Sequence, residues 1–228
     1  MKNTLEFLNN KWTGYLLETF VIIVSILSAF MLDSWHEERK ERKFEHEVLI
    51  EIRSSIQSNI EFLDRGIRTN NRAINSCQLI LDYFDTGLPY NDSLDTYFSQ
   101  SLMWFYPSLE NNAYESLKSY GLHLITNDSI REELGKIYEW KFIERLSMRQ
   151  DEYFNGTVAP LLTDWFESYD IFGEMKPLNY NELRKSTKYR HILKTMISNR
   201  IAQNTIFSQT RAGRVHLDEM IKTELSKK

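Results

Sequence analysis

The pattern of apolar and polar positions divides the chain into one continuous apolar stretch and a longer part with helical periodicity. Residues 15–32 read YLLETFVIIVSILSAFML, in which Glu18 is the only charged residue. At about 1.5 Å per residue, a helix over this stretch is roughly 27 Å long, close to the thickness of the hydrocarbon core of a bilayer. We therefore expect a short N-terminal segment, residues 1–14, followed by a transmembrane helix over residues 15–35.

The residues that flank the apolar stretch predict its orientation. Aromatic rings, which favour the membrane interfaces, stand near both ends: Trp12, Tyr15 and Trp35. Two lysines precede the stretch, Lys2 and Lys11, and a denser basic cluster follows it: Arg39, Lys40, Arg42 and Lys43. The positive-inside rule then predicts a single-pass protein of a bacterial inner membrane, with its N-terminus outside and its C-terminal domain in the cytoplasm.

Two alternatives to a membrane span stay open at this stage. A signal peptide has a similar layout, but residues 27–34 offer no convincing small-x-small cleavage site and the basic cluster follows at once. A buried helix of a soluble protein is the second alternative, and Glu18 makes it more plausible. Because no other segment of comparable apolarity exists to pack around it, we favour the membrane span.

A second apolar pattern, with spacings of three, four and seven, follows the apolar stretch. Its positions are Phe44, Val48, Ile52, Ile56, Ile60, Leu63, Ile67, Ile74 and Leu81. This is the periodicity of an amphipathic helix, so we expect the membrane helix to continue into a juxtamembrane stalk helix over residues 36–85. Gly87 and Pro89 mark the first clear break.

The remaining residues, 86–228, predict a cytosolic helical domain. Two short helices are expected over residues 94–106 and 108–120, because Pro107 divides them. Gly121 is a plausible C-terminal stop for the second of these helices.

Capping and breaking residues define the later helices. Asn127 or Asp128 caps the next one, and Pro160 should break or kink it. A last long helix runs from about residue 187 to residue 225, with Gly213 as a point where it could be interrupted. Because no segment alternates as a strand does, the predicted fold class is all-α.

Glu18 is the first candidate functional residue, because an ionisable group inside a membrane segment is costly and tends to face a bundle interior or a water-filled path. Helical spacing places three further residues on its face: Ile22, Ser25 and Ala29. Ser25 and Ala29 form a small-xxx-small pair that lets helices approach closely. This face predicts a homo-oligomer, a tetramer or similar, in which it lines a pore or forms a seam. A Glu18 that snorkels to the outer headgroups is the alternative.

One face of the last helix combines basic, amide and aromatic side chains. Spacings of four and three bring together Arg200, Asn204, Phe207, Arg211 and Arg214. Guanidinium groups neutralise phosphates and an aromatic ring stacks on bases, so this face predicts binding of a nucleotide or single-stranded nucleic acid. Secondary basic candidates are Arg72, Lys188 and Arg190. In the alternative interpretation, Phe207 belongs to the core and the arginines pair with the acidic middle segment of the chain.

Charge is distributed unevenly along the domain. Residues 86–175 hold six basic and fifteen acidic residues, a net charge of −9, whereas residues 176–228 hold twelve and four, a net charge of +8. The two segments could dock on each other, since complementary faces within a domain are common. Alternatively, the acidic segment could hold a partner protein at the membrane.

The sequence carries no motif of a known enzyme class. There is no Gly-rich phosphate loop, no paired-cysteine metal signature and no nucleophile elbow, and the five histidines are scattered without ligand spacing. We therefore expect no catalysis, no metal site and no cofactor.

Two stretches resemble an uncharacterised family of bacterial single-pass membrane proteins. The first, residues 14–52, reads GYLLETFVIIVSILSAFMLDSWHEERKERKFEHEVLIEI and matches the family at Glu18 and from Trp35 to Lys40, although Leu17 stands where the family has glycine. The second, residues 113–140, reads AYESLKSYGLHLITNDSIREELGKIYEW and is similar to a Leu-Lys, Gly, then Asn-Asp-Ser pattern. The resemblance implies membrane anchoring and a helical cytosolic domain, and no activity.

The layout of the chain also resembles that of membrane effectors of bacterial anti-phage systems, in which a cytosolic helical domain controls a pore. Our leading hypothesis is a homo-oligomeric ion channel or pore-forming effector, gated when its cytosolic domain binds a nucleotide or nucleic-acid ligand. The alternative is a non-conducting, membrane-anchored scaffold that recruits a partner protein.

Overall fold

A computed structural model describes the chain over three ranges: residues 2–140, 142–170 and 173–227. Within these ranges, side chains are described from residue 15 onward, with the exception of residue 144. Three residues used to predict the orientation therefore lie outside the described side chains: Lys2, Lys11 and Trp12.

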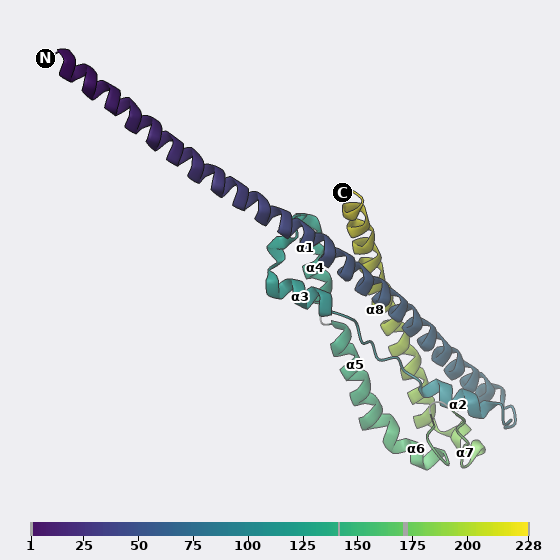
Figure 1. The fold of residues 1–228 in the computed structure, drawn as a ribbon. Helices are drawn as coiled ribbons and strands as arrows, with labels where there is room; N and C mark the ends of the chain where they lie inside the picture. Colours follow the sequence, from purple (N-terminus) through teal and green to yellow (C-terminus); the bar gives the residue numbers. More distant parts are fainter. Residues whose placement is uncertain (1, 141, 171–172, 228) are drawn as a thin grey trace. The chain divides into compact units, whose positions relative to one another are not determined.

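The described residues are helical, which confirms the predicted all-α fold class. No strand occurs in the described ranges, where one isolated antiparallel bridge joins Phe166 to Pro177. The first helix, α1 (Lys2–Thr86), contains both the predicted transmembrane helix and the predicted stalk helix (Figure 1). It ends at the predicted break, since Gly87 has a φ of +69°, which glycine adopts most readily.

The chain divides into two compact units, residues 1–48 and residues 49–228. In the first unit, every described side chain from Tyr15 to Lys43 is exposed. A core helix of a soluble protein would bury an apolar stripe, so the structure of this chain does not support that alternative. This helix is long and apolar enough to cross a membrane.

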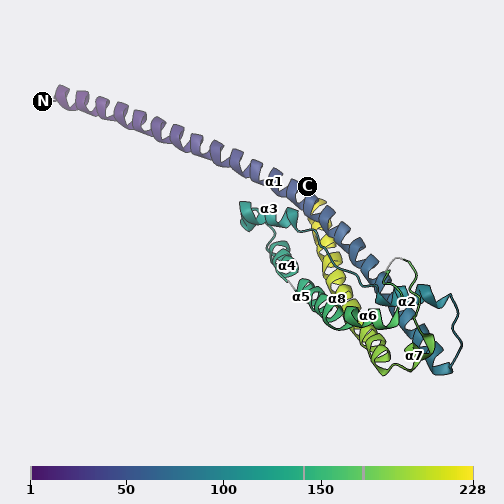
Figure 2. The same cartoon turned by 90° about the horizontal axis from the view of Figure 1, so that it is seen from below.

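In the second unit, α1 from residue 49 onward lies antiparallel to the last helix, α8 (Thr187–Leu225), as Figures 1 and 2 both show. Side chains of the two helices meet in opposite order along the chain: Arg53 with Asp218, Asp64 with Arg211, Asn70 with Gln203, and Asp85 with Arg190. The apolar stripe of the predicted stalk, including Ile52, Ile56 and Leu63, is therefore buried within its own unit.

The segment between α2 (Leu94–Leu102) and α3 (Asn112–Tyr120) is not helical. The predicted end of the first helix, residue 106, and the predicted start of the second, residue 108, were therefore wrong. Pro107 gives the physical reason, because it lacks an N–H donor and disfavours helical geometry at the preceding residue. The predicted stop of the second helix is confirmed, since Gly121 follows α3 with a φ of +119°. A short 3₁₀ turn, η1 (Leu122–Leu124), comes next.

Side chains of α1 and α8 hold this connecting segment in place. Ser55 and Asn59 donate hydrogen bonds to the carbonyl oxygen of Glu110, at 3.1 and 2.9 Å, and Asn59 also accepts from the Glu110 N–H. Gln203 donates to the carbonyl oxygen of Phe105. The polar side chains within the helix pair thus satisfy backbone groups that no helix or sheet satisfies.

The predicted cap at Asn127 is confirmed, because its side-chain oxygen accepts from the N–H groups of Ser129 and Ile130 at the start of α4 (Asp128–Tyr138). The single helix expected from there to Pro160 is instead divided. It comprises α4, α5 (Phe142–Tyr153), a π-helical turn, η2 (Phe154–Val158), and α6 (Ala159–Trp165).

Pro160 stands in the first turn of α6, where its missing N–H costs least. After α6 come the short helix α7 (Tyr180–Lys185) and then α8. The interruption expected at Gly213 is absent from the described helix, which runs unbroken from Thr187 to Leu225. A Cβ atom at Gly213 would meet only Ile137, at 3.9 Å, so glycine is not required there for packing.

The larger apolar cluster surrounds Tyr189, a fully buried residue in the first turn of α8. Four aromatic rings from other parts of the second unit lie with their centroids between 5.1 and 6.4 Å from the Tyr189 ring: Phe84, Phe98, Trp165 and Phe166. These residues come from α1, α2, α6 and the segment after α6. Because Trp165 and Phe166 are adjacent, one side chain of α8 therefore joins three other parts of the chain.

A smaller cluster lies further along the helix pair, where Leu63, Ile143 and Phe207 are buried together. Gly66 lets the rings approach α1, because a Cβ atom there would lie 2.6 Å from Phe105 and 2.8 Å from Phe207.

A polar layer also joins α1 to α8. Asn70 donates to the side-chain oxygens of Gln203 and Asn204, at 2.8 and 2.9 Å, and Gln203 donates to Gln150 at 3.1 Å. Such buried amides favour one register of the helix pair, since a shift would leave them unpaired.

Candidate functional site

The candidate face of the apolar helix is exposed on the single chain. Glu18, Ile22, Ser25 and Ala29 all have exposed side chains. The Ser25 hydroxyl donates to the carbonyl oxygen of Val21 within the same helix, at 2.7 Å. The face is therefore free to meet lipid or another copy of the helix, and its role in a pore or seam stays a prediction.

The candidate face of α8 is mostly buried, whereas a surface that binds nucleic acid was expected to be exposed. Arg200, Phe207 and Arg214 are buried, with at most 3% of each exposed. The interpretation of these three residues as an exposed surface for nucleic acid is wrong. The alternative, in which Phe207 belongs to the core, is confirmed.

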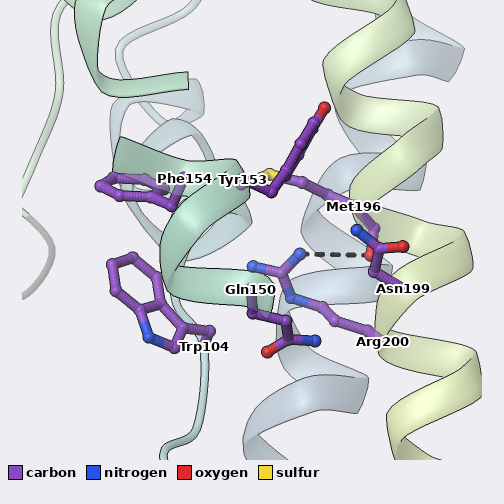
Figure 3. A pocket seen from close by; sticks show the side chains of 7 residues that line it. All are labelled: Trp104, Gln150, Tyr153, Phe154, Met196, Asn199 and Arg200. Atoms are coloured by element: carbon purple, nitrogen blue, oxygen red, sulfur yellow. Dashed lines mark hydrogen bonds between the residues drawn. The ribbon is translucent and has the colours of Figure 1, made fainter. Parts of the chain in front are cut away.

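Arg200 is held by backbone carbonyl groups rather than by a carboxylate. Its Nε and Nη2 donate to the carbonyl oxygen of Met103, and its Nη1 donates to that of Met196, at 3.2 Å (Figure 3). Met103 directly follows α2, where the helix dipole favours a cation. The guanidinium therefore has acceptors, and burial lowers its pKa.

The cavity beside Arg200 is small. It is also lined by Trp104, Gln150, Tyr153 and Phe154, as Figure 3 shows, and it has a volume of about 20 Å³. This is room for about one water molecule. The nearby Cys77 cannot serve as a nucleophile at neutral pH, because burial raises the pKa of its thiol to about 11.

Asn204 and Arg211, the other two residues of the face, contact α1. Asn204 accepts from Asn70 and donates to Asn71 at 2.8 Å. Arg211 Nε donates to Asp64 Oδ1 at 2.7 Å, and both side chains are partly exposed. The five residues do lie on one face of α8, but that face mainly packs into the protein.

The secondary basic candidates do not form one patch. Arg190 pairs with Asp85, and its guanidinium lies 5.3 Å from the centroid of the Phe84 ring. Arg72 and Lys188 are exposed. Because α1 and α8 are antiparallel, with Asn70 beside Gln203 and Asp85 beside Arg190, these two residues stand roughly 20 Å apart along the helix pair.

Arg214 lies beside a larger cavity, with a volume of about 240 Å³, which sequence reasoning missed. Its walls come from three parts of the second unit: the segment between α2 and α3, the end of α4 with Trp140, and Ile143 of α5. The guanidinium carbon of Arg214 lies 5.9 Å from the centroid of the Tyr138 ring. No pattern in the sequence indicated this cavity, because helices were expected over the segment between α2 and α3, which is not helical.

The acidic and basic segments do pack on each other, since α4 and α5 contact α8, but ion pairs do not hold the described parts together. Among the described residues, no ion pair joins residues 86–175 to residues 176–228. The basic side chains of α8 that pair across elements instead meet Asp64 and Asp85 of α1. The acidic excess of residues 86–175 is thus left largely at the surface, where Asp164, Glu167 and Glu174 are exposed.

No group of three or more potential metal ligands occurs among the residues that the structure describes. We found no family model, curated protein or solved structure that matches the chain. These comparisons therefore add nothing to the resemblance of residues 14–52 and 113–140. The fold defines the protein only as all-α, with one N-terminal helix long and apolar enough to span a membrane.

Proposed function

We propose that this chain is a single-pass membrane protein. Its N-terminal helix anchors a helical unit, residues 49–228, which recruits a partner protein to the membrane. The observation that carries the proposal is the continuous exposure of large apolar side chains from Tyr15 to Trp35. Soluble proteins rarely leave so long an apolar surface in water, whereas a bilayer core matches its length.

The end of the apolar stretch supports the orientation expected from the sequence. Arg39 lies one helical turn after Trp35, and its guanidinium is 5.7 Å from the centroid of the exposed indole ring. An aromatic ring followed by basic side chains is typical of the cytoplasmic interface of a membrane helix. We therefore place residues 49–228 on the cytoplasmic side of a bacterial inner membrane.

Fractionation of bacterial membranes tests this proposal. We expect the full chain to stay in the membrane pellet after alkaline carbonate extraction, because only an inserted helix resists that treatment. A reporter that fluoresces only in the cytoplasm, fused after Lys228, should be bright, whereas a reporter that is active only in the periplasm should be silent. Release by carbonate would contradict the anchor, and the opposite reporter pattern would contradict the orientation.

A homo-oligomeric pore is the second candidate function, and Glu18 is the observation that favours it. The carboxyl group lies in the apolar stretch, on the exposed face that also carries Ser25 and Ala29. Several helices that meet along this face would surround Glu18 with other copies and give it a polar path. Conduction requires such an assembly, because one helix cannot enclose a pore.

The mass of the protein in detergent separates the pore from the scaffold. If the face forms a seam, we expect a tetramer or similar, and Ala29→Leu should weaken the assembly because a larger side chain keeps the helices apart. Met31→Leu, a change outside the small-xxx-small pair, is the matched control. A monomer would contradict the pore and leave the scaffold, whose exposed acidic surface suits a basic partner protein. Planar-bilayer recording of an oligomer, with Glu18→Gln as a comparison, then tests conduction.

A further inference from the structure

Arg214 is a buried cation with no ion-pair partner among the side chains that the structure describes. Only 3% of the residue is exposed, its Nε is buried without a hydrogen-bond partner, and no ion pair of Arg214 occurs among the described residues. An arginine side chain stays protonated in proteins, so a full positive charge is held there. An unpaired buried charge is costly, whereas a buried charge with a partner is common.

Three carboxylates close to Arg214 in sequence or along the neighbouring helices are engaged elsewhere. Asp218, one turn further along α8, accepts from Arg53 at 3.0 Å and from Gln57 at 3.2 Å. Asp64 pairs with Arg211, and Glu139 pairs with Lys118 at 2.9 Å. None of these groups neutralises Arg214.

Tyr138, whose ring faces Arg214, does not supply the charge either. Burial raises the pKa of its hydroxyl, so the phenol stays protonated at neutral pH. The hydroxyl lies beside Ser55, so it has a polar neighbour of its own. The ring thus offers Arg214 a weak cation–π contact and no negative charge.

Arg200 shows how this protein treats a buried arginine that has a structural role. Its guanidinium donates to two carbonyl oxygens, beside a cavity with room for about one water molecule. Within the part of the chain that the structure describes, the Nε of Arg214 has no acceptor, and the side chain borders a cavity of about 240 Å³. The difference between the two arginines points to an external partner for Arg214.

The walls of the Arg214 cavity suit a small organic molecule. Most of the lining residues are apolar or aromatic, but polar atoms contribute more of the surface that faces the cavity, and they include the amide of Asn111 and the hydroxyl of Ser108. Tyr106 and Trp140 are about half exposed, so they form the side of the cavity nearest to solvent. Sites for drug-sized ligands have volumes of roughly 300 to 1,000 Å³, so this cavity fits a smaller compound.

We propose that this cavity binds a small organic oxyanion, whose carboxylate or phosphate group pairs with the guanidinium of Arg214 and whose planar apolar body lies against Tyr106, Tyr138 and Trp140. A guanidinium binds either oxyanion through two parallel hydrogen bonds. The inference concerns the second unit alone and does not depend on the membrane anchor.

Titration of the full-length protein in detergent tests the site with three probes: phenyl phosphate, benzoate and inorganic phosphate. We expect phenyl phosphate or benzoate to bind, with a change in tryptophan fluorescence because Trp140 lines the cavity. Arg214→Met should weaken that binding by at least about tenfold, since it removes the charged partner of the anion. The bound probe should also raise the unfolding temperature of the unmodified protein but not that of the variant.

Arg211→Met is the matched control, because Arg211 lies one turn away on α8 and outside the cavity lining. The affinity of this variant for the organic probe should differ less than about twofold from that of the unmodified protein, because Arg211 does not touch the ligand. The Arg214→Met variant should stay folded, because replacing an unpaired buried charge by an apolar side chain is neutral or stabilising. Equal binding by this variant, or no binding of the organic probes to the unmodified protein, would overturn the site. Inorganic phosphate binding as tightly as phenyl phosphate would overturn the role of the aromatic walls.

Discussion

Replacement of Tyr189 by alanine should lower the free energy of unfolding of the second unit by about 3 to 5 kcal/mol, the usual cost of removing a large buried aromatic side chain. Tyr189 is fully buried, and its ring lies between Phe84, Phe98, Trp165 and Phe166. These rings come from three parts of the chain, namely the end of α1, α2 and the end of α6. The cavity left by alanine would therefore loosen the contacts of α1, α2 and α6 with α8.

Thermal unfolding of the full chain in detergent, followed by far-ultraviolet circular dichroism, measures this effect. For a chain of this size, we expect the midpoint to fall by roughly 10 °C. Tyr189→Phe is the matched control, because it keeps the ring and removes only the hydroxyl, which lies beside Ser101. The free energy of unfolding of this control should lie within about 1 kcal/mol of that of the unmodified protein, or above it. A loss for phenylalanine as large as that for alanine would show that the hydroxyl, and not the ring packing, matters.

Replacement of Val24 by arginine should prevent stable insertion of the N-terminal helix into a membrane. Val24 lies near the middle of the apolar stretch and is exposed on the single chain. An arginine at the centre of a membrane helix costs about 2.5 to 3.5 kcal/mol on insertion scales, enough to shift insertion from nearly complete to minor. The variant should be extracted by alkaline carbonate to a much larger extent than the unmodified chain.

Val24→Leu provides the control for this experiment, since it keeps the position apolar and should stay in the membrane pellet. The helical unit of residues 49–228 carries no change in either variant, so circular dichroism of the extracted protein should show the same helix content. If the arginine variant resisted carbonate as well as the leucine variant did, the apolar stretch would not be the membrane anchor. The result is independent of whether the protein forms an oligomer.

Periodicity and local capping were sufficient to predict several elements of this fold. The spacing of apolar residues after Phe44 predicted the continuation of α1, and Gly87 and Gly121 marked the ends of α1 and α3. Asn127 predicted the start of α4. These signals are local, because each depends on the conformation of one residue or on a repeat within one helix.

The connection between α2 and α3 shows where local signals were not enough. Pro107 was correctly expected to separate two helices, but the unwound segment is longer than the proline alone requires. Ser55, Asn59 and Gln203 stabilise it by satisfying its backbone groups from other helices. Polar residues at core positions of α1 and α8 were the available signal, although the sequence did not show which backbone groups they meet.

At the candidate site on α8, too, local signals predicted the helix face but not what packs against it. Helical spacing correctly placed Arg200, Phe207 and Arg214 on one face, because that geometry is a property of the helix alone. Whether the face meets solvent depends on what packs against it, and here the second half of α1 and the segment after α2 cover it.

By itself, then, the sequence determined the helical class, the long apolar N-terminal helix and the residues that share each helix face, since these follow from composition and from periodicity along one helix. Only the tertiary structure decided that Arg200 binds backbone carbonyl groups, that Arg211 pairs with Asp64, and that Arg214 borders a cavity with no ion-pair partner among the described side chains. The physical reason is that burial and pairing depend on contacts between residues far apart in sequence, which the pattern along one helix does not specify.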